Sequence, residues 1–381
     1  MLKQIAARIV KQYLQKIRYK KNRRMFESFF RKIMKQNPDN INNPINNPAY
    51  DSWFAKWSVF GFAPTPLAWK AFAPYMNDNI DFVPNDVARS FIEPVLTPEA
   101  YQPFYNDKNS FGLFLDKSWM PKTYFRSMNG VLYDEDYGTV RPEDFLQLFD
   151  GVDRLVVKPA KDMGGKGVAL FKRDGVSFKD SAGNILDLQY LKKTYKKDFL
   201  IQECLTQNDY MSQFNPSSIN TIRVATYRDV KTGNIEFLGA VLRIGGKGSF
   251  VDNACSGGSF VYVNADGTLG KYACNEYGQT SSVYNDIDFA NNEFVIPNFE
   301  EIKQFAYKVA RRMPHMSLFA NDVAIDHTGT PRLIEVNTIQ FSYWLYQFNG
   351  KPVFGPYTDE LIEYCLKENK NIRPSFFLKY D

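Results

Sequence analysis

Hydrophobic and polar positions alternate in the segment at residues 319–337, FANDVAIDHTGTPRLIEVN, which predicts two strands joined by a turn rich in Asp, Thr, Gly and Pro. Successive side chains on a strand point to opposite faces, so Glu335 and Asn337 point the same way. If the two strands pair, Asp322 lies opposite them. Three oxygen donors on one face suit Mg²⁺ that also holds phosphates. The alternative is a polar hairpin whose carboxylates face water.

Apolar runs of strand length recur through the middle of the chain. They lie at residues 155–159, 168–172, 199–205, 220–227, 236–243 and 259–263. Short turns join the last three runs, which are therefore predicted to form one antiparallel sheet. Helical periodicity predicts further helices at residues 142–149, 188–195, 299–312 and 357–368. Mixed elements of this kind indicate an α+β fold.

Residues 1–36 predict a separate basic amphipathic helix. Apolar side chains recur at helical spacing, at Leu2, Ile5, Ile9, Tyr13 and Ile17. Twelve basic residues and a single acid give this arm a net charge of +11, which leaves −6 on the remaining chain. The stripe could pack on the protein itself, or the arm could lie on an anionic membrane surface. Nucleic acid is disfavoured, because no base-reading motif is present.

Two further regions follow the arm. The Asn- and Pro-rich tract at residues 37–47 predicts a linker or an ordered loop. The N-terminal region, residues 37–105, continues with an aromatic, Pro-rich sequence that predicts short helices at 66–75 and 85–91 and no dinucleotide-binding unit. The main domain is expected at residues 106–381. Its aromatic segment at residues 341–348 is expected to belong to the core rather than to a substrate pocket.

Composition narrows the chemistry. A chain of 381 residues with 44% hydrophobic residues can build a large enzyme core. It has no run of transmembrane length and no signal-peptide pattern, and its four cysteines lack zinc-site spacing, so a reducing cytoplasm is expected. With two histidines, His315 and His327, in the whole sequence, Ser-His-Asp or Cys-His catalysis is not expected.

The segment at residues 153–174, DRLVVKPAKDMGGKGVALFKRD, predicts a strand that ends in a lysine, a glycine loop and a second strand. Gly164, Gly165 and Gly167 allow backbone N–H groups to turn toward a ligand. Lys158 and Lys166 add positive charge, as a phosphate site requires. The Walker pattern is absent, and an ordinary flexible hairpin is the alternative.

Arg223 and Arg243 each interrupt an otherwise apolar strand, which is costly unless an anion lies beside them. A bound phosphate or carboxylate would fill that role. The alternative is a structural ion pair with an acid of the chain, for which the candidates are Glu203, Asp229, Glu236 and Asp252. A second glycine-bearing loop, VDNACSGG at residues 251–258, offers the amide of Asn253.

The motifs at residues 107–363 together resemble those of the ATP-grasp superfamily, and they occur in that superfamily's order. The resemblance implies an ATP-grasp fold in which two α+β subdomains clamp a nucleotide, here preceded by the basic helix, with a flap subdomain at about residues 150–205. Lys108 would contact the α-phosphate of ATP and Lys158 the α- and β-phosphates. The glycine loop, residues 163–167, would close over the phosphates.

The same resemblance assigns the remaining residues. Adenine and ribose would be held by the residues after the strand at 199–205, namely Glu203, Cys204, Leu205 and Asp209. Magnesium would be held by Asp322, Glu335 and Asn337. The phosphoryl and acyl end of the site would be lined by Arg223, Arg243 and Asn253.

The runs SSINTIRVATYRD and LRIGGKGSFVDNACSGG most resemble the sugar-transfer associated ATP-grasp group. That resemblance implies a carboxylate–amine ligase that uses ATP and Mg²⁺ and joins an amino compound to a carboxylate of a cell-surface polysaccharide precursor. A phosphotransferase and a nucleotide-binding docking partner in a polysaccharide assembly are the alternatives. The expected location is cytoplasmic, at the inner face of the membrane if the arm binds lipid. No recognisable α/β domain precedes Lys108, so the acceptor site is unassigned.

Overall fold

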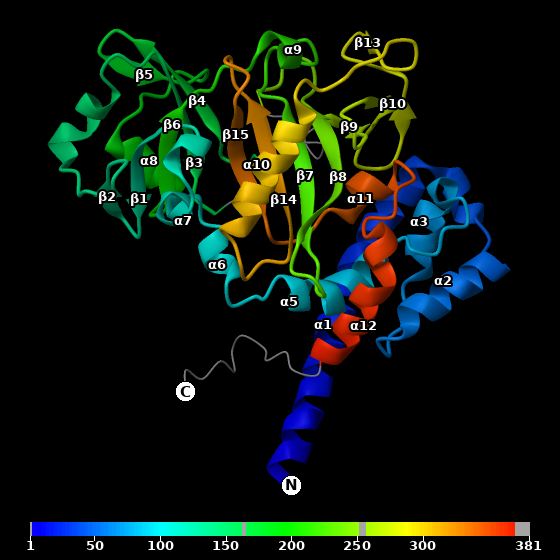
Figure 1. Ribbon diagram of the computed structural model, residues 1–381. Helices are drawn as coiled ribbons and strands as arrows, with labels where there is room; N and C mark the ends of the chain where they lie inside the picture. Colours follow the sequence, from blue (N-terminus) through cyan, green and yellow to red (C-terminus); the bar gives the residue numbers. More distant parts are fainter. Residues whose placement is uncertain (1, 162–164, 251–256, 370–381) are drawn as a thin grey trace.

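The computed structural model describes residues 2–161, 165–250 and 257–369, with side chains from residue 9 onward. Two large antiparallel sheets and a group of helices make up these residues (Figure 1). The predicted α+β class is therefore confirmed. Gly164 and Asn253, both predicted at the site, lie outside the described residues.

The first sheet has the strand order β2-β1-β6-β3-β4-β5. Its strands are β1 (Thr123–Met128), β2 (Val131–Tyr133), β3 (Arg154–Pro159), β4 (Ala169–Asp174), β5 (Ser177–Lys179) and β6 (Phe199–Glu203). Helix α8 (Leu188–Tyr195) and the 3-10 helix η5 (Pro142–Phe149) cover it with Leu191, Phe145 and Phe149. Burial of these aromatic and aliphatic side chains supplies the core of this half of the molecule.

The second sheet has the strand order β11-β10-β9-β8-β7-β14-β15. Its strands are β7 (Thr221–Arg228), β8 (Ile235–Ile244), β9 (Ser259–Val263), β10 (Leu269–Cys274), β11 (Thr280–Ser281), β14 (Leu318–Ile325) and β15 (Pro331–Asn337). A small hairpin, β12 (Val283–Tyr284) and β13 (Ile287–Asp288), lies beside it. The predicted hairpin at residues 319–337 is confirmed, because β14 and β15 pair antiparallel.

The prediction that the runs at residues 220–227, 236–243 and 259–263 form one antiparallel sheet is confirmed, because β8 pairs antiparallel with β7 and with β9. Strand β6 pairs with β1 and β3 of the first sheet, whereas β7, β8 and β9 lie in the second. An apolar run reveals that a strand is buried but not which strand it pairs with. The connection after β6 leads into α9 (Asp209–Ser212) and carries the chain from one sheet to the other.

Each face of the second sheet packs against helices. Helix α10 (Phe299–Arg311) covers one face through Phe299, Ile302, Phe305 and Val309, which recur at helical spacing. On the other face a helical group packs on Val241 and Phe260. It contains α1 (Leu2–Gln36), α2 (Pro48–Ser58), α3 (Pro66–Met76), α4 (Asn85–Val87), the π-helix η2 (Ala88–Ile92), α5 (Glu93–Leu96), α11 (Tyr343–Gln347) and α12 (Thr358–Glu368). The aromatic segment at residues 341–348 belongs to this core, as predicted.

Shorter helices complete the described elements. They are η1 (Pro38–Asn42), α6 (Gln102–Tyr105), η3 (Lys108–Ser110), α7 (Phe111–Phe114), η4 (Lys117–Trp119) and η7 (Gly355–Tyr357). The Asn- and Pro-rich tract is an ordered loop: the Asn37 side chain donates to the Tyr277 carbonyl at 2.8 Å and that of Asn43 to the Lys70 carbonyl at 2.8 Å. Within the part of the chain that is described, no helix is long and apolar enough to cross a membrane.

Candidate active site

Five predicted site residues share one face of the second sheet. Asp322 of β14 stands directly opposite Arg223 of β7 on one side and Glu335 of β15 on the other. Asn337 follows Glu335 by two residues. Arg243 is two residues from Val241, which stands opposite Arg223. Because side chains alternate along every strand, pairing places all five on the same face.

Asp322 forms the centre of this cluster. Arg223 donates to both of its carboxylate oxygens, from Nε at 2.7 Å and from Nη2 at 2.8 Å, and Arg243 Nη1 donates at 2.7 Å. Asp322 is 2% exposed. Burial alone would raise the pKa of Asp322, but the charges of Arg223 and Arg243 outweigh burial and lower that pKa to about 2. The cluster therefore carries a fixed negative charge between two positive ones.

The partner of the two arginines differs from the acids considered from the sequence. Asp322 holds both, and neither Glu203 nor Glu236 was the right candidate for the bidentate contact with Arg223. The reason is the register, which places Asp322 directly across from Arg223 on the neighbouring strand. The sequence separates these two residues widely and gives no register.

Glu335 connects the second sheet to the lysines of the nucleotide motifs. Its Oε1 lies 2.8 Å from Nζ of Lys108, at the start of η3. Lys158, 8% exposed at the end of β3, lies close enough for burial and the charge of Lys108 to lower its pKa to about 7, with Glu335 acting in the opposite direction. Two lysines and one carboxylate from three separate elements therefore meet here.

Two of the three oxygen donors predicted for Mg²⁺ contact the guanidinium of Arg223. Oδ2 of Asp322 and Oδ1 of Asn337 lie 2.8 and 3.2 Å from the same nitrogen, Nη2 of Arg223. Glu335 stands next to Asp322 across the strand pair. The ion pair of Glu335 is with Lys108 rather than with Arg223. Two carboxylates and an amide oxygen are the hard donors that Mg²⁺ prefers. The chemistry of this donor set therefore fits a divalent metal. Among the described residues no group of three His, Cys, Asp or Glu side chains could hold a metal ion, and this set has two such side chains, its third donor being the amide of Asn337.

Residues 97–359 match the family model described as sugar-transfer associated ATP-grasp. The match covers more than half of the chain. This chain belongs to the sugar-transfer associated ATP-grasp family. A search of curated protein sequences gave no match.

Solved structures similar to this ATP-grasp chain share little sequence with it. The ATP-grasp ligase PsnB, complexed with a phosphomimetic variant of minimal precursor, Mg and ADP, is 14% identical, with a TM-score of 0.38 over 71% of this chain and 61% of that chain. N5-carboxyaminoimidazole synthetase from Staphylococcus aureus is 11% identical (TM-score 0.36, 65% and 50%). D-cycloserine synthetase DcsG is 10% identical (TM-score 0.39, 70% and 73%). The chain thus spans 61% of the first of these structures and half of the second.

The predicted adenine segment of this ATP-grasp chain begins where β6 ends. Glu203 is tied to Lys122, because its backbone N–H donates to the Lys122 carbonyl at 2.9 Å and its Oε1 accepts from the Lys122 N–H at 2.8 Å. Cys204 and Leu205 are half-buried and follow outside the strand. Asp209 is exposed in the first turn of α9. The roles of these residues toward a nucleotide stay predictions.

The glycine loop has the backbone its sequence predicts. Gly165 and Gly167 have φ angles of +72° and +73°, which favour glycine. A Cβ on Gly167 would lie 3.3 Å from the Pro159 ring. Lys166 between them is exposed. The loop therefore leaves β3, the strand of Lys158, with a lysine side chain facing solvent.

Sequence reasoning missed Tyr346 of α11. Its side chain packs over β8, where Cδ1 would be 3.1 Å from a Cβ added at Gly239. The hydroxyl is buried and has no hydrogen-bond partner among the described residues. Burial raises the pKa of Tyr346, and the charges of Arg223 and Asp322 also act on it. The sequence signal was Gly239, because a lone glycine within an apolar strand indicates that another group packs closely against the strand backbone.

Proposed function

We propose that this chain is an ATP-dependent carboxylate–amine ligase that works through an acyl phosphate. The observation that carries the proposal is the charged face on which Arg223, Arg243 and Asp322 meet Glu335, and through it Lys108. Membership of an ATP-grasp family supports the same reaction class. Buried charges of this density are expensive to keep, so a structural role alone explains them poorly.

The proposed reaction proceeds in two steps. A carboxylate oxygen of the first substrate attacks the γ-phosphorus of ATP, the bond to the bridging oxygen breaks, and ADP leaves. An amine then attacks the acyl carbon, loses a proton and expels inorganic phosphate. The protein's part is to orient the substrates and to offset charge that spreads over the phosphoryl oxygens, so no histidine is needed.

In this proposal Lys108 and Lys158 hold the phosphates of ATP, and Arg223 and Arg243 lie at the phosphoryl and acyl end. Asp322, Glu335 and Asn337 would hold Mg²⁺, which supplies positive charge to the phosphate oxygens when bound. The lowered pKa of Lys158 supports its role, because a lysine without enough negative charge nearby gains most from a bound phosphate.

We propose a carboxylate of a cell-surface polysaccharide precursor as the first substrate and an amino compound as the second. The family description supports a setting in sugar transfer. The reaction would take place in the cytoplasm, at the inner face of the membrane where such precursors gather.

The decisive experiment measures phosphate release from MgATP by the full chain with pooled amino acids and pooled uronic acids or nucleotide-linked uronic acids, followed by mass spectrometry. A product with the mass of both substrates minus water, formed together with ADP and free phosphate, supports the ligase. A product that retains phosphate, with no phosphate released, points instead to a phosphotransferase. MgATP binding with no turnover on any pool contradicts the ligase for these substrate classes and favours a docking role.

A further inference from the structure

The first half of α1 extends away from the rest of the molecule (Figure 1). Along the described part of the helix the first buried side chain is Tyr19. Before it, apolar side chains face solvent: Ile9 is 61% exposed, Tyr13 64% and Ile17 46%. These three residues follow one another at intervals of four, so they form a continuous stripe on one side of the helix. A contiguous exposed apolar stripe marks an interaction surface.

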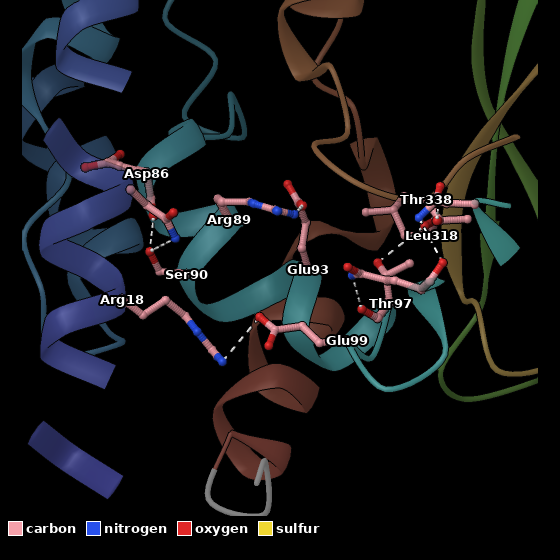
Figure 2. A network of polar contacts seen from close by, with 12 residues as sticks. Arg18, Asp86, Arg89, Ser90, Glu93, Thr97, Glu99, Leu318 and Thr338 are labelled. Carbon is pink, nitrogen blue, oxygen red and sulfur yellow. Dashed lines mark hydrogen bonds and ion pairs between the residues drawn. The ribbon is translucent and has the colours of Figure 1, made fainter. Parts of the chain in front are cut away.

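The second half of the same helix is fixed to the protein. Phe30 and Ile33 are fully buried in the core of the helical group. Near the junction, Arg18 pairs with Glu99 at 3.4 Å, and the Asn22 side chain donates to Ser90 Oγ at 3.1 Å (Figure 2). The helix therefore packs on the protein through residues that follow the stripe, and the alternative that the stripe itself packs on the protein is wrong for Ile9, Tyr13 and Ile17. The exposed stripe is held out in a fixed direction.

Positive charge surrounds the stripe. Lys16, Lys20, Lys21 and Arg24 are exposed, and Glu27 is the first acid along the helix. An apolar stripe combined with a basic surface fits the boundary of an anionic bilayer, where apolar side chains enter between headgroups and cations meet lipid phosphates. We propose that residues 9–21 dock on an anionic membrane surface. The stripe of Ile9, Tyr13 and Ile17 inserts, and the neighbouring lysines contact the headgroups.

Two other partners fit these observations less well. A second copy of the chain could cover the stripe, but it would bring together two strongly positive helices without acids to pair them. A nucleic acid would neutralise the charge but would leave the three apolar side chains in water. A membrane satisfies both features at once.

Docking of the arm would also orient the candidate active site. The segment from Ser90 to Glu99 that contacts α1 also contacts the start of β14: the Ser317 N–H donates to the Leu96 carbonyl at 2.7 Å, and Thr97 Oγ1 donates to the Leu318 carbonyl at 3.4 Å. One short segment therefore joins the arm to the strand of Asp322. The membrane proposal does not rest on the ligase reaction, since the arm carries none of the proposed catalytic groups.

The test is sedimentation of the full chain with vesicles of phosphatidylcholine mixed with phosphatidylglycerol, and with pure phosphatidylcholine vesicles. Binding is expected to the mixed vesicles and to weaken as salt is raised. The triple variant Lys16→Gln, Lys20→Gln, Lys21→Gln should bind roughly a hundredfold more weakly, since each basic residue near an anionic surface contributes about a fivefold factor. Replacing Ile9, Tyr13 and Ile17 together by Asp should abolish binding.

Matched controls separate these effects from general changes of the surface. Val176→Asp removes an apolar side chain that is 92% exposed elsewhere, and Lys192→Gln with Lys193→Gln removes two exposed charges on α8. Both should bind like the unchanged chain. The proposal is overturned if the Asp variant still binds mixed vesicles. It is also overturned if the unchanged chain ignores both kinds of vesicle, or if light scattering shows a dimer that the Asp variant converts to a monomer without any vesicle binding.

Discussion

Lys108 and Glu335 form an ion pair, with 2.8 Å between Nζ and Oε1, that joins the segment before the first sheet to the last strand of the second. Lys108 is also fixed by its backbone N–H, which donates to the Ala160 carbonyl directly after β3. The pair therefore lies where elements of both sheets come together. In the proposed ligase this is the place where phosphates and metal would meet.

Replacing Glu335 by Ala should lower the turnover rate of MgATP at least about a hundredfold, because the site would lose a metal-holding carboxylate at the reacting phosphates. The fold should persist, since Glu335 is partly exposed and lies on an edge strand. Phosphate release and the circular dichroism spectrum measure the two effects. Glu363→Ala, on the exposed side of α12, is the control and should be fully active. Full activity of Glu335→Ala would refute the metal role.

Asp322→Asn should be strongly destabilising. The substitution leaves the buried guanidinium groups of Arg223 and Arg243 without the charge that holds them, and removing one partner of a buried ion pair costs about 3–5 kcal/mol. Denaturant unfolding measures the free energy difference. The comparison is Asp286→Asn, whose partner Lys247 is exposed, and which should leave the unfolding midpoint nearly unchanged. Equal midpoints for the two variants would show that the cluster does not depend on its central acid.

Lys158 should make nucleotide binding depend on pH. Burial and the charge of Lys108 lower its pKa to about 7, so above pH 7 the unliganded protein has released this proton. Bound phosphates favour the ammonium and raise the pKa again. Binding of MgADP at pH 8 should therefore take up about one proton, and the affinity should fall as pH rises from 7 to 9. Calorimetry in buffers of different ionisation enthalpy counts the protons.

The variant Lys158→Met supplies the matching control, since it keeps a long apolar stem and has no proton to exchange. This variant should bind MgADP more weakly, and binding should take up no proton at this site. Lys192→Met, on the exposed face of α8, should behave like the unchanged chain. Uptake that persists in Lys158→Met would assign the proton to another group.

Period-two alternation was enough to place Glu335 and Asn337 on one face, because parity along a strand is a local property. The hairpin turn then brought Asp322 to the same face. The ion-pair partner of Arg223 could not be predicted from this alternation, because it depends on which strands are neighbours and on the register in which they pair. The pairing of β6 with β1 and β3 depends on the same information and leaves no local trace in the sequence.

The arm shows a related limit. Its periodic apolar positions correctly predicted a helix, now seen as α1. They could not show that burial begins at Tyr19 while Ile9 and Tyr13 stay exposed, because the same stripe can face a protein core or a membrane. Tyr346 was missed for a similar reason. An aromatic residue in an apolar segment is taken for a core residue until the structure shows that its buried hydroxyl has no hydrogen-bond partner among the described residues.

Tyr346→Phe tests whether that hydroxyl serves the reaction. A buried hydroxyl without a partner carries a desolvation cost of about 1–3 kcal/mol, so removing it should leave the protein as stable or make it more stable. If the hydroxyl bonds a substrate beside Arg223 and Arg243, turnover should nevertheless fall by about tenfold, the loss expected for a single hydrogen bond. Phe341→Leu is the structural comparison. It removes the ring that stacks on Tyr346 and should lower the stability of the fold instead. Unchanged turnover in a stable Tyr346→Phe would mean that the phenol belongs to the core alone, because packing of the ring, unlike a bond to the substrate, survives loss of the oxygen.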